Sequence, residues 1–85
     1  MPAPVQVQVL LFAVAAERAG TRQVPLALPL GCRIDAVGRR LLELYPGLQA
    51  VLPMCRWAVD CQFVADDFQL TGDVTLAVIP PVSGG

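Results

Sequence analysis

The sequence contains no histidine and no lysine, and only 15% of its 85 residues are charged. Histidine is the most common general base, so the chain has neither that group nor a Ser-His pair for nucleophilic catalysis. Six arginines stand against seven acidic residues, and a net charge of −1 gives no electrostatic reason to bind nucleic acid or an anionic membrane. These absences argue against a self-contained enzyme and against both of those partners.

Long apolar runs and metal-ligand clusters are also missing. No uninterrupted apolar run approaches the roughly 20 residues that a membrane-spanning helix needs. The start, Met1-Pro2-Ala3-Pro4, lacks the positive region of a secretory signal, so a cytoplasmic protein is expected. Cys32, Cys55 and Cys61 form no Cys-x-x-Cys pair, and without histidine they make neither a disulfide framework nor a zinc site. We expect reduced, buried or half-buried, inert thiols.

What the sequence does contain is apolar. Hydrophobic residues make up 55% of the chain, which indicates a compact globule and not a disordered segment. At 85 residues the chain is long enough for one core and too short for two. We therefore predict a single domain over residues 1–85, with a flexible tail at residues 80–85.

The first half of the chain predicts two strands and two helices. Residues 5–11 begin with strict apolar-polar alternation, which Leu10, Leu11 and Phe12 break, and they predict a half-buried strand. An alanine-rich helix follows and stops at Gly20. Residues 23–28 predict an edge strand, because Pro25 cannot donate a backbone hydrogen bond.

The clearest helical periodicity runs from Ile34 to Tyr45 and ends at Pro46-Gly47. Gly38 inside this helix suggests close contact with the sheet. Residues 56–61 predict a strand with Trp57 and Val59 on one face, and Phe63-Val64 predict a brief one.

The remaining residues before the tail predict turns around a short segment and then a strand. After a turn at Asp66-Asp67, Phe68 and Leu70 are expected to face the core, and Thr71-Gly72-Asp73 predicts a second turn. Residues 74–79 are apolar on both faces, as in a central strand.

This order of elements predicts an α+β domain in which one long helix crosses a mixed sheet. A right-handed crossover would place the last strand beside the first. Such an arrangement is a ubiquitin-like β-grasp. The order of elements alone also permits a ferredoxin-like sheet.

The tail Pro80-Pro81-Val82-Ser83-Gly84-Gly85 follows the last strand directly. The two prolines fix φ and withhold backbone donors, so the chain must leave the sheet there. Gly84 and Gly85 have no Cβ and fit a channel too narrow for a side chain, which would present the carboxyl group of Gly85 to another protein. A disordered end is the simpler interpretation of Gly-Gly alone. Two rigid prolines followed by two glycines without side chains instead favour insertion of the tail into another protein.

The segment from Ile79 to Gly85 resembles the C-terminus of the small sulfur-carrier subunits of molybdopterin synthase, the MoaD family of the ubiquitin-like ThiS/MoaD superfamily. Leu11-Phe12-Ala13, Pro46-Gly47 and Gly72-Asp73 also match this family, so the resemblance covers nearly the whole chain and implies the β-grasp. Two departures stand out. Ala58-Val59-Asp60 replaces a usual Ala-Val-Asn, and the six residues between Gly72-Asp73 and Pro80 are more than the family commonly has.

The resemblance implies that partner proteins supply the chemistry. A ubiquitin-activating-like adenylyltransferase would adenylate Gly85 with ATP, and a sulfur donor protein would convert it to a thiocarboxylate. The large subunit of molybdopterin synthase would accept the tail and transfer sulfur to the pterin precursor. Gly84 would let the tip through, residues 80–83 would aim it, and this chain would bind no metal or cofactor.

The resemblance also implies an apolar partner-binding patch at Phe12, Ile79 and Phe63. The alternative for these three residues is that all belong to the core. Three alternative functions also stay open: a sulfur carrier for thiazole or cysteine synthesis, a ubiquitin-like protein modifier, and an interaction module with an inert tail.

Overall fold

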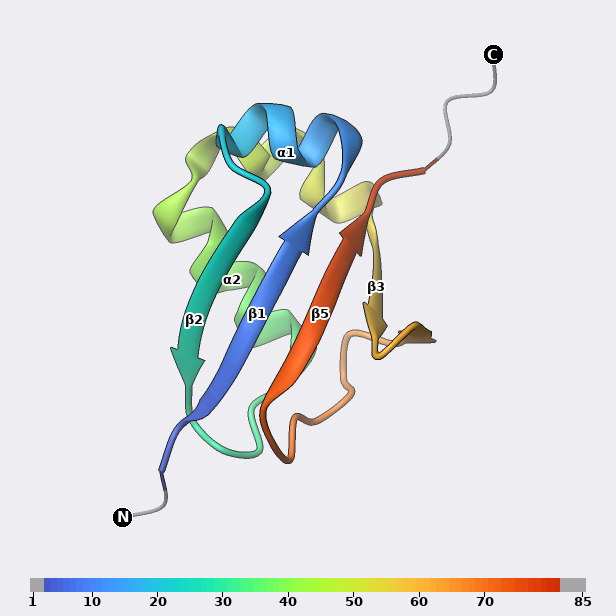
Figure 1. Ribbon diagram of the computed structural model, residues 1–85. Helices are drawn as coiled ribbons and strands as arrows, with labels where there is room; N and C mark the ends of the chain where they lie inside the picture. Colours follow the sequence, from blue (N-terminus) through green and yellow to red (C-terminus); the bar gives the residue numbers. More distant parts are fainter. Residues whose placement is uncertain (1–2, 82–85) are drawn as a thin grey trace.

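The computed structural model describes residues 3–81 and consists of one five-stranded sheet covered on one side by helices (Figure 1). In chain order the elements are β1 (Val5–Leu11), α1 (Ala13–Ala19), β2 (Gln23–Leu28), α2 (Ile34–Leu44), the 3-10 turns η1 (Pro46–Ala50) and η2 (Leu52–Met54), β3 (Arg56–Val59), β4 (Gln62–Val64) and β5 (Val74–Ile79).

The strand order is β2-β1-β5-β3-β4, with β1 and β5 parallel and the other pairs antiparallel. The last strand therefore lies beside the first at the centre of the sheet, and β2, which carries Pro25, is an edge strand. These features confirm the predicted α+β, ubiquitin-like β-grasp. The ferredoxin-like alternative is wrong.

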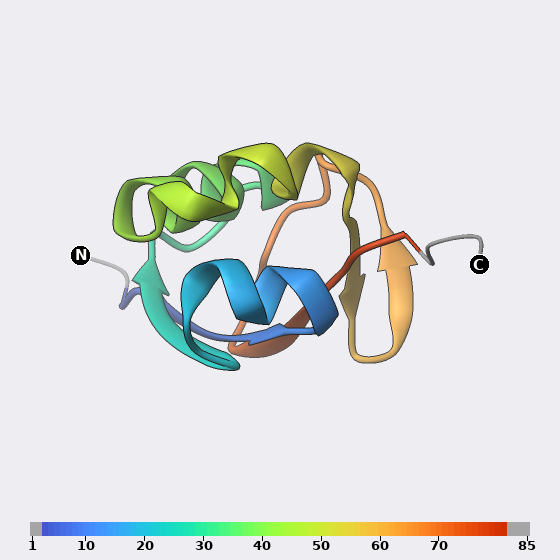
Figure 2. The ribbon, with the colours of Figure 1, turned by 90° about the horizontal axis from the view of Figure 1, so that it is seen from above.

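The core lies between the sheet and α2, and Figure 2 shows the helices gathered on one side of the strands. Alternate residues of β1 face this layer, so Val7 and Val9 are buried while Gln6 is exposed. From α2 the core receives Ile34, Val37 and Leu41, all fully buried. Burying a side chain of this size stabilises the fold by about 1.5–3 kcal/mol, so these layers dominate the stability of the domain.

Three local predictions are confirmed. Gly20 ends α1 with φ of 75°, a left-handed conformation that glycine adopts without strain. A Cβ on Gly38 would lie 3.4 Å from the Trp57 indole, so α2 approaches β3 closely at that point. Trp57 and Val59 are both buried on the inner face, as their alternation predicted.

Three local predictions are wrong. β3 ends at Val59, because Asp60 and Cys61 have φ of 48° and 69° and form the two-residue turn of the β3–β4 hairpin. Phe68 is 41% exposed, since only Leu70 of that segment turns inward. Cys61 is exposed in the hairpin turn, whereas Cys32 and Cys55 are half-buried as expected.

Gly47 provides a stability test of the packing between α1 and η1. A Cβ at this position would lie 2.8 Å from the backbone carbonyl oxygen of Arg18, which cannot move independently of α1. We expect Gly47→Ala to lower the free energy of unfolding by about 1–3 kcal/mol, as overpacking does elsewhere. The matched control is Gly72→Ala, where a Cβ meets nothing within 4 Å. Equal melting temperatures for the two variants would contradict this prediction.

Candidate docking face and tail exit

The predicted tail leaves the sheet beside the end of β1. Because β1 and β5 are parallel neighbours, with Leu11 paired to Val78, both strands end at the same edge. Pro80 follows β5 and is buried, whereas Pro81 is exposed, so the chain turns outward between them. The predicted tail residues Val82, Ser83, Gly84 and Gly85 lie outside the described residues.

The sheet face that carries no helices has an apolar row near this edge. Strand register aligns Leu10 with Ala77, Ala77 with Ala58, and Ala58 with Phe63. All four side chains share the outer face because successive residues of a strand alternate between faces. Four strands thus contribute to one continuous strip.

A second row lies closer to the tail exit. Ile79 pairs with Arg56 on β3, and Phe12 stands next to Ile79 because its neighbour Leu11 pairs with Val78. Phe12 keeps an extended backbone, with φ of −118° and ψ of 151°, so its side chain continues the outer face of β1. We call the two rows the docking face, a candidate surface for partner binding, and it consists of Leu10, Phe12, Ala58, Phe63, Ala77 and Ile79.

The three residues predicted for partner binding therefore come together on one surface. Phe12 is 47% exposed and Phe63 is 56% exposed, so the alternative that they are core residues is wrong for both. Ile79 is half-buried and lies between them in the sheet order. Exposed aromatic side chains on a sheet face are typical of interface cores.

Sequence reasoning missed Leu10, Ala58 and Ala77. The sequence contains a signal for Leu10, because an apolar residue stands there where the alternation of the first strand predicts a polar one. An apolar residue on the outer face indicates a candidate contact surface. Nothing in the sequence marks the two alanines, because only the register of β3 and β5 aligns them. Ala58 is buried and Ala77 half-buried, so the exposed part of this face comes mainly from its larger side chains.

Two arginines border the docking face. The Arg56 guanidinium lies 3.9 Å from the centroid of the Phe63 ring, in a cation–π contact worth about 0.5–1 kcal/mol at an exposed site. Arg22 lies just before β2, on the other side of β1. Neither arginine forms an ion pair within residues 3–81.

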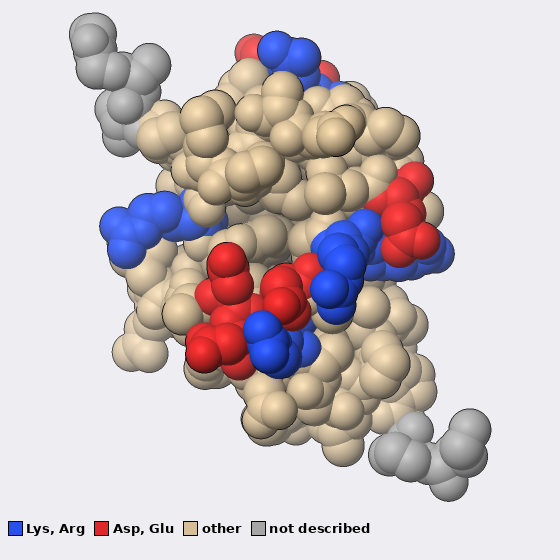
Figure 3. Space-filling model, turned by 180° about the vertical axis from the view of Figure 1, so that it is seen from behind, with Lys and Arg blue, Asp and Glu red and all other residues tan. Residues whose placement is uncertain are grey.

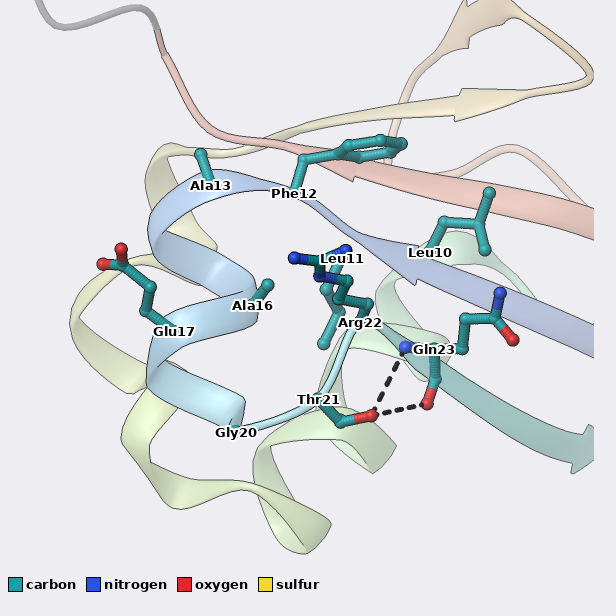
Figure 4. Close-up of a pocket in the computed structure, with 10 residues that line it drawn as sticks. All are labelled: Leu10, Leu11, Phe12, Ala13, Ala16, Glu17, Gly20, Thr21, Arg22 and Gln23. Atoms are coloured by element: carbon teal, nitrogen blue, oxygen red, sulfur yellow. Dashed lines mark hydrogen bonds between the residues drawn. The ribbon is translucent and has the colours of Figure 1, made fainter.

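A groove of about 720 Å³ adjoins the docking face at the end of β1. Figure 4 shows Leu10 and Phe12 on one side of the Arg22 side chain and Ala16 of α1 on the other, whereas the Glu17 side chain points away from them. Thr21 fixes the chain at the groove's end, where its hydroxyl donates a hydrogen bond to the Gln23 carbonyl oxygen.

The helix side of the molecule has a different surface. Figure 3 shows acidic and basic side chains interspersed across it. Two ion pairs involve residues at or within α2, Arg33–Asp35 at 2.8 Å and Arg40–Glu43 at 3.8 Å. Exposed ion pairs of this kind are worth at most about 1 kcal/mol. The charged face and the apolar docking face thus lie on opposite sides of the domain.

The described part of the chain offers no metal-ligand cluster. No group of three or more Cys, Asp or Glu side chains within residues 3–81 is arranged to hold an ion. Across the same residues, no helix has the length and apolar character to cross a membrane.

The cysteines differ in their surroundings and should differ in reactivity. Burial raises the pKa of both the Cys32 and Cys55 thiols, although a backbone hydrogen bond partly offsets the effect at Cys32. Cys55 Sγ also donates a hydrogen bond to the Val51 carbonyl oxygen at 3.3 Å.

We expect iodoacetamide at a pH of about 8 to alkylate Cys61 before Cys32 and Cys55, because the thiolate is the nucleophile and is less populated where the pKa is raised. Raising the pH should narrow the difference, because thiolate forms at the two half-buried sites as pH approaches their pKa. Peptide mapping after timed alkylation measures the order. Equal rates at all three sites would contradict it.

Comparison with known proteins agrees with this architecture. The ThiS family model matches residues 9–85. A molybdopterin synthase sulfur carrier subunit from Caenorhabditis elegans is 32% identical over 83 residues, covering 95% of this chain and 99% of the relative. The subunit of the same name from Homo sapiens is 36% identical over 84 residues, covering 94% of each chain.

A solved structure extends the comparison to the fold. SAMP1 from Haloferax volcanii superposes with a TM-score of 0.84 at 25% identity, covering 94% of this chain and 99% of SAMP1. The match spans the whole β-grasp, and the family match includes both the docking face and the tail. The chain therefore belongs to the ThiS family of ubiquitin-like β-grasp proteins.

Proposed function

We propose that this protein is the sulfur carrier subunit of molybdopterin synthase and acts in the cytoplasm. The observation that carries the proposal is the joint position of the tail and the docking face. β5 leads to Pro80 and Pro81 at the same sheet edge at which the exposed Phe12 and the half-buried Ile79 form an apolar surface. The names of the curated relatives support the same function.

The chemistry begins with an unreactive group. An α-carboxyl has a pKa of about 3.3–3.7 and is an anion at neutral pH, so it is a poor acyl donor. An adenylyltransferase partner would couple the Gly85 carboxylate to the α-phosphate of ATP and release pyrophosphate. Hydrosulfide released by a sulfur donor protein would then attack the acyl carbon and displace AMP. The product is a thiocarboxylate at Gly85.

This chain's contribution is to position that group. Pro80 and Pro81 restrict the directions in which the tail leaves β5, and Gly84 keeps its tip free of side chains. The docking face would hold the domain against the large subunit while the tail enters that subunit's active site. The large subunit would transfer the sulfur to the pterin precursor, so this chain is a donor and not the catalyst.

Mass spectrometry of the intact protein tests the carrier chemistry. We expect incubation with the activating enzyme, ATP and a sulfur donor to raise the mass by the difference between one sulfur and one oxygen atom. Omitting ATP is the control, because the carboxylate cannot exchange its oxygen without activation. An unchanged mass in the complete reaction would refute the carrier proposal.

A protein modifier is a second candidate, favoured by the likeness to SAMP1, a small archaeal modifier protein. A modifier would form an amide between Gly85 and a target amine, so its mass would rise by that of a whole target protein. The lack of lysine means that this chain could not extend itself through its own side chains. Reconstitution with the large subunit separates the two functions, because only a carrier would release product and return to the free carboxylate.

A further inference from the structure

We propose that the docking face selects its partner by charge as well as by shape. The groove beside Phe12 receives an apolar side chain of the large subunit, while Arg22 and Arg56 pair with carboxylates that lie near that side chain on the large subunit. This inference rests on the proposed function, because it takes the large subunit as the occupant. It adds the chemistry that the partner's surface must have.

The groove is continuous with the docking face. Leu10 and Phe12 belong to both, so a partner that covers the face also covers the groove's mouth. On the opposite wall, Ala16 and Gly20 have small side chains or none, so they leave space in the groove. A Cβ built on Gly20 meets nothing within 4 Å. An interface that left this groove of about 720 Å³ open would forfeit packing contacts, and Phe12 and Ala16 offer an apolar lining to a partner side chain next to the Arg22 side chain (Figure 4).

The charges around the docking face are asymmetric. Arg22 lines the groove beside β1, Arg56 lies over the Phe63 ring at the β3–β4 side, and both are exposed and without an ion pair within residues 3–81. Asp60 and Asp73 belong to the other end of the strands, where Asp73 accepts a hydrogen bond from the Gln6 backbone N–H. Glu17 lines the groove only from the α1 side.

Carboxylates on the partner are the groups that fit this arrangement. Arginine presents a planar fork that pairs with a carboxylate in two parallel hydrogen bonds. Arg56 is already held over the Phe63 ring, so less side-chain freedom is lost when it pairs. A partner with lysine or arginine at these positions would be repelled, and the two arginines therefore also exclude wrong partners.

Calorimetric titration of charge-reversal variants against the large subunit of the same organism tests the electrostatic part. We expect Arg22→Glu and Arg56→Glu each to lower the affinity about tenfold or more, since reversal turns an attraction into a repulsion. Raising the salt concentration should weaken wild-type binding and strengthen binding of the double variant. Arg39→Glu is the matched control, because Arg39 is an exposed arginine on α2 and forms no ion pair within residues 3–81.

Filling the groove tests the packing part. Ala16→Leu should lower the affinity by occupying the space meant for the partner, with circular dichroism and thermal melting confirming that the domain still folds. Wild-type affinity in the Arg22→Glu and Arg56→Glu variants, or in Ala16→Leu, would overturn the corresponding half of the proposal. Mass spectrometry distinguishes failure of this proposal from failure of the proposed function. If the thiocarboxylate forms and the wild-type complex assembles, wild-type affinity in these variants refutes only the inferred chemistry of the partner's surface. Absence of any wild-type complex would refute this proposal and the proposed subunit function together.

Discussion

Deleting Gly85 is expected to abolish sulfur transfer and to leave the melting temperature unchanged. The deletion removes the carboxyl carbon that the proposed mechanism activates and leaves the new terminal carboxyl one residue short of the partner's catalytic groups. A displacement of this size is decisive, because misplacing reacting atoms by about 1 Å already costs about a hundredfold in rate. The core residues of β1, β5 and α2 all lie upstream of the tail, so folding should be unaffected. Single-turnover product formation with the large subunit measures the loss.

A lengthened tail and a control away from the tail refine this test. Adding one residue after Gly85 should be equally inactive, because it displaces the reactive group in the other direction. Arg39→Ala, at an exposed position on α2, is the control expected to retain turnover. Full activity of the Gly85 deletion, or a large drop in its melting temperature, would show that the tail has a different role.

Phe12→Asp is expected to weaken the complex with the large subunit by about 30-fold or more, which corresponds to the 2 kcal/mol that marks an interface hot spot. Phe12 is 47% exposed and stands between the groove and Ile79, so a carboxylate there would be desolvated at the centre of the interface. The fold should persist, because the side chain is not part of the buried core. Phe68→Asp is the matched control, since Phe68 is 41% exposed and lies outside the docking face.

The same titration separates the domain from its tail. A six-residue tail extended at about 3.3–3.6 Å per residue spans roughly 20 Å, enough to reach a buried pocket of a neighbour. Ordering it costs about 1–2 kcal/mol per residue, so the tail alone should bind weakly and the docking face must supply most of the affinity. If a synthetic peptide of residues 78–85 binds as tightly as the whole protein, the docking face has no such role.

The sequence by itself determined those features that depend on neighbouring residues. Alternation located β1 and the inner face of β3, and Gly20 and Pro46-Gly47 set the ends of both helices, because these signals act within a few residues. The family resemblance, carried mainly by the tail pattern, supplied the proposed chemistry and selected Phe12, Ile79 and Phe63. Residues close in sequence can reveal an element or a motif, but not what lies beside it.

Only the tertiary structure decided which distant residues share a surface. The alignment of Leu10, Ala77, Ala58 and Phe63 follows from the pairing of four strands, and a shift of one residue in any of them would turn its side chains to the other face. The two-residue hairpin at Asp60 and Cys61 sets part of that register, and its left-handed backbone is not one that these residue types require. The groove and its flanking arginines depend on the same pairing, because their positions relative to Phe12 are fixed by contacts between segments far apart in the chain.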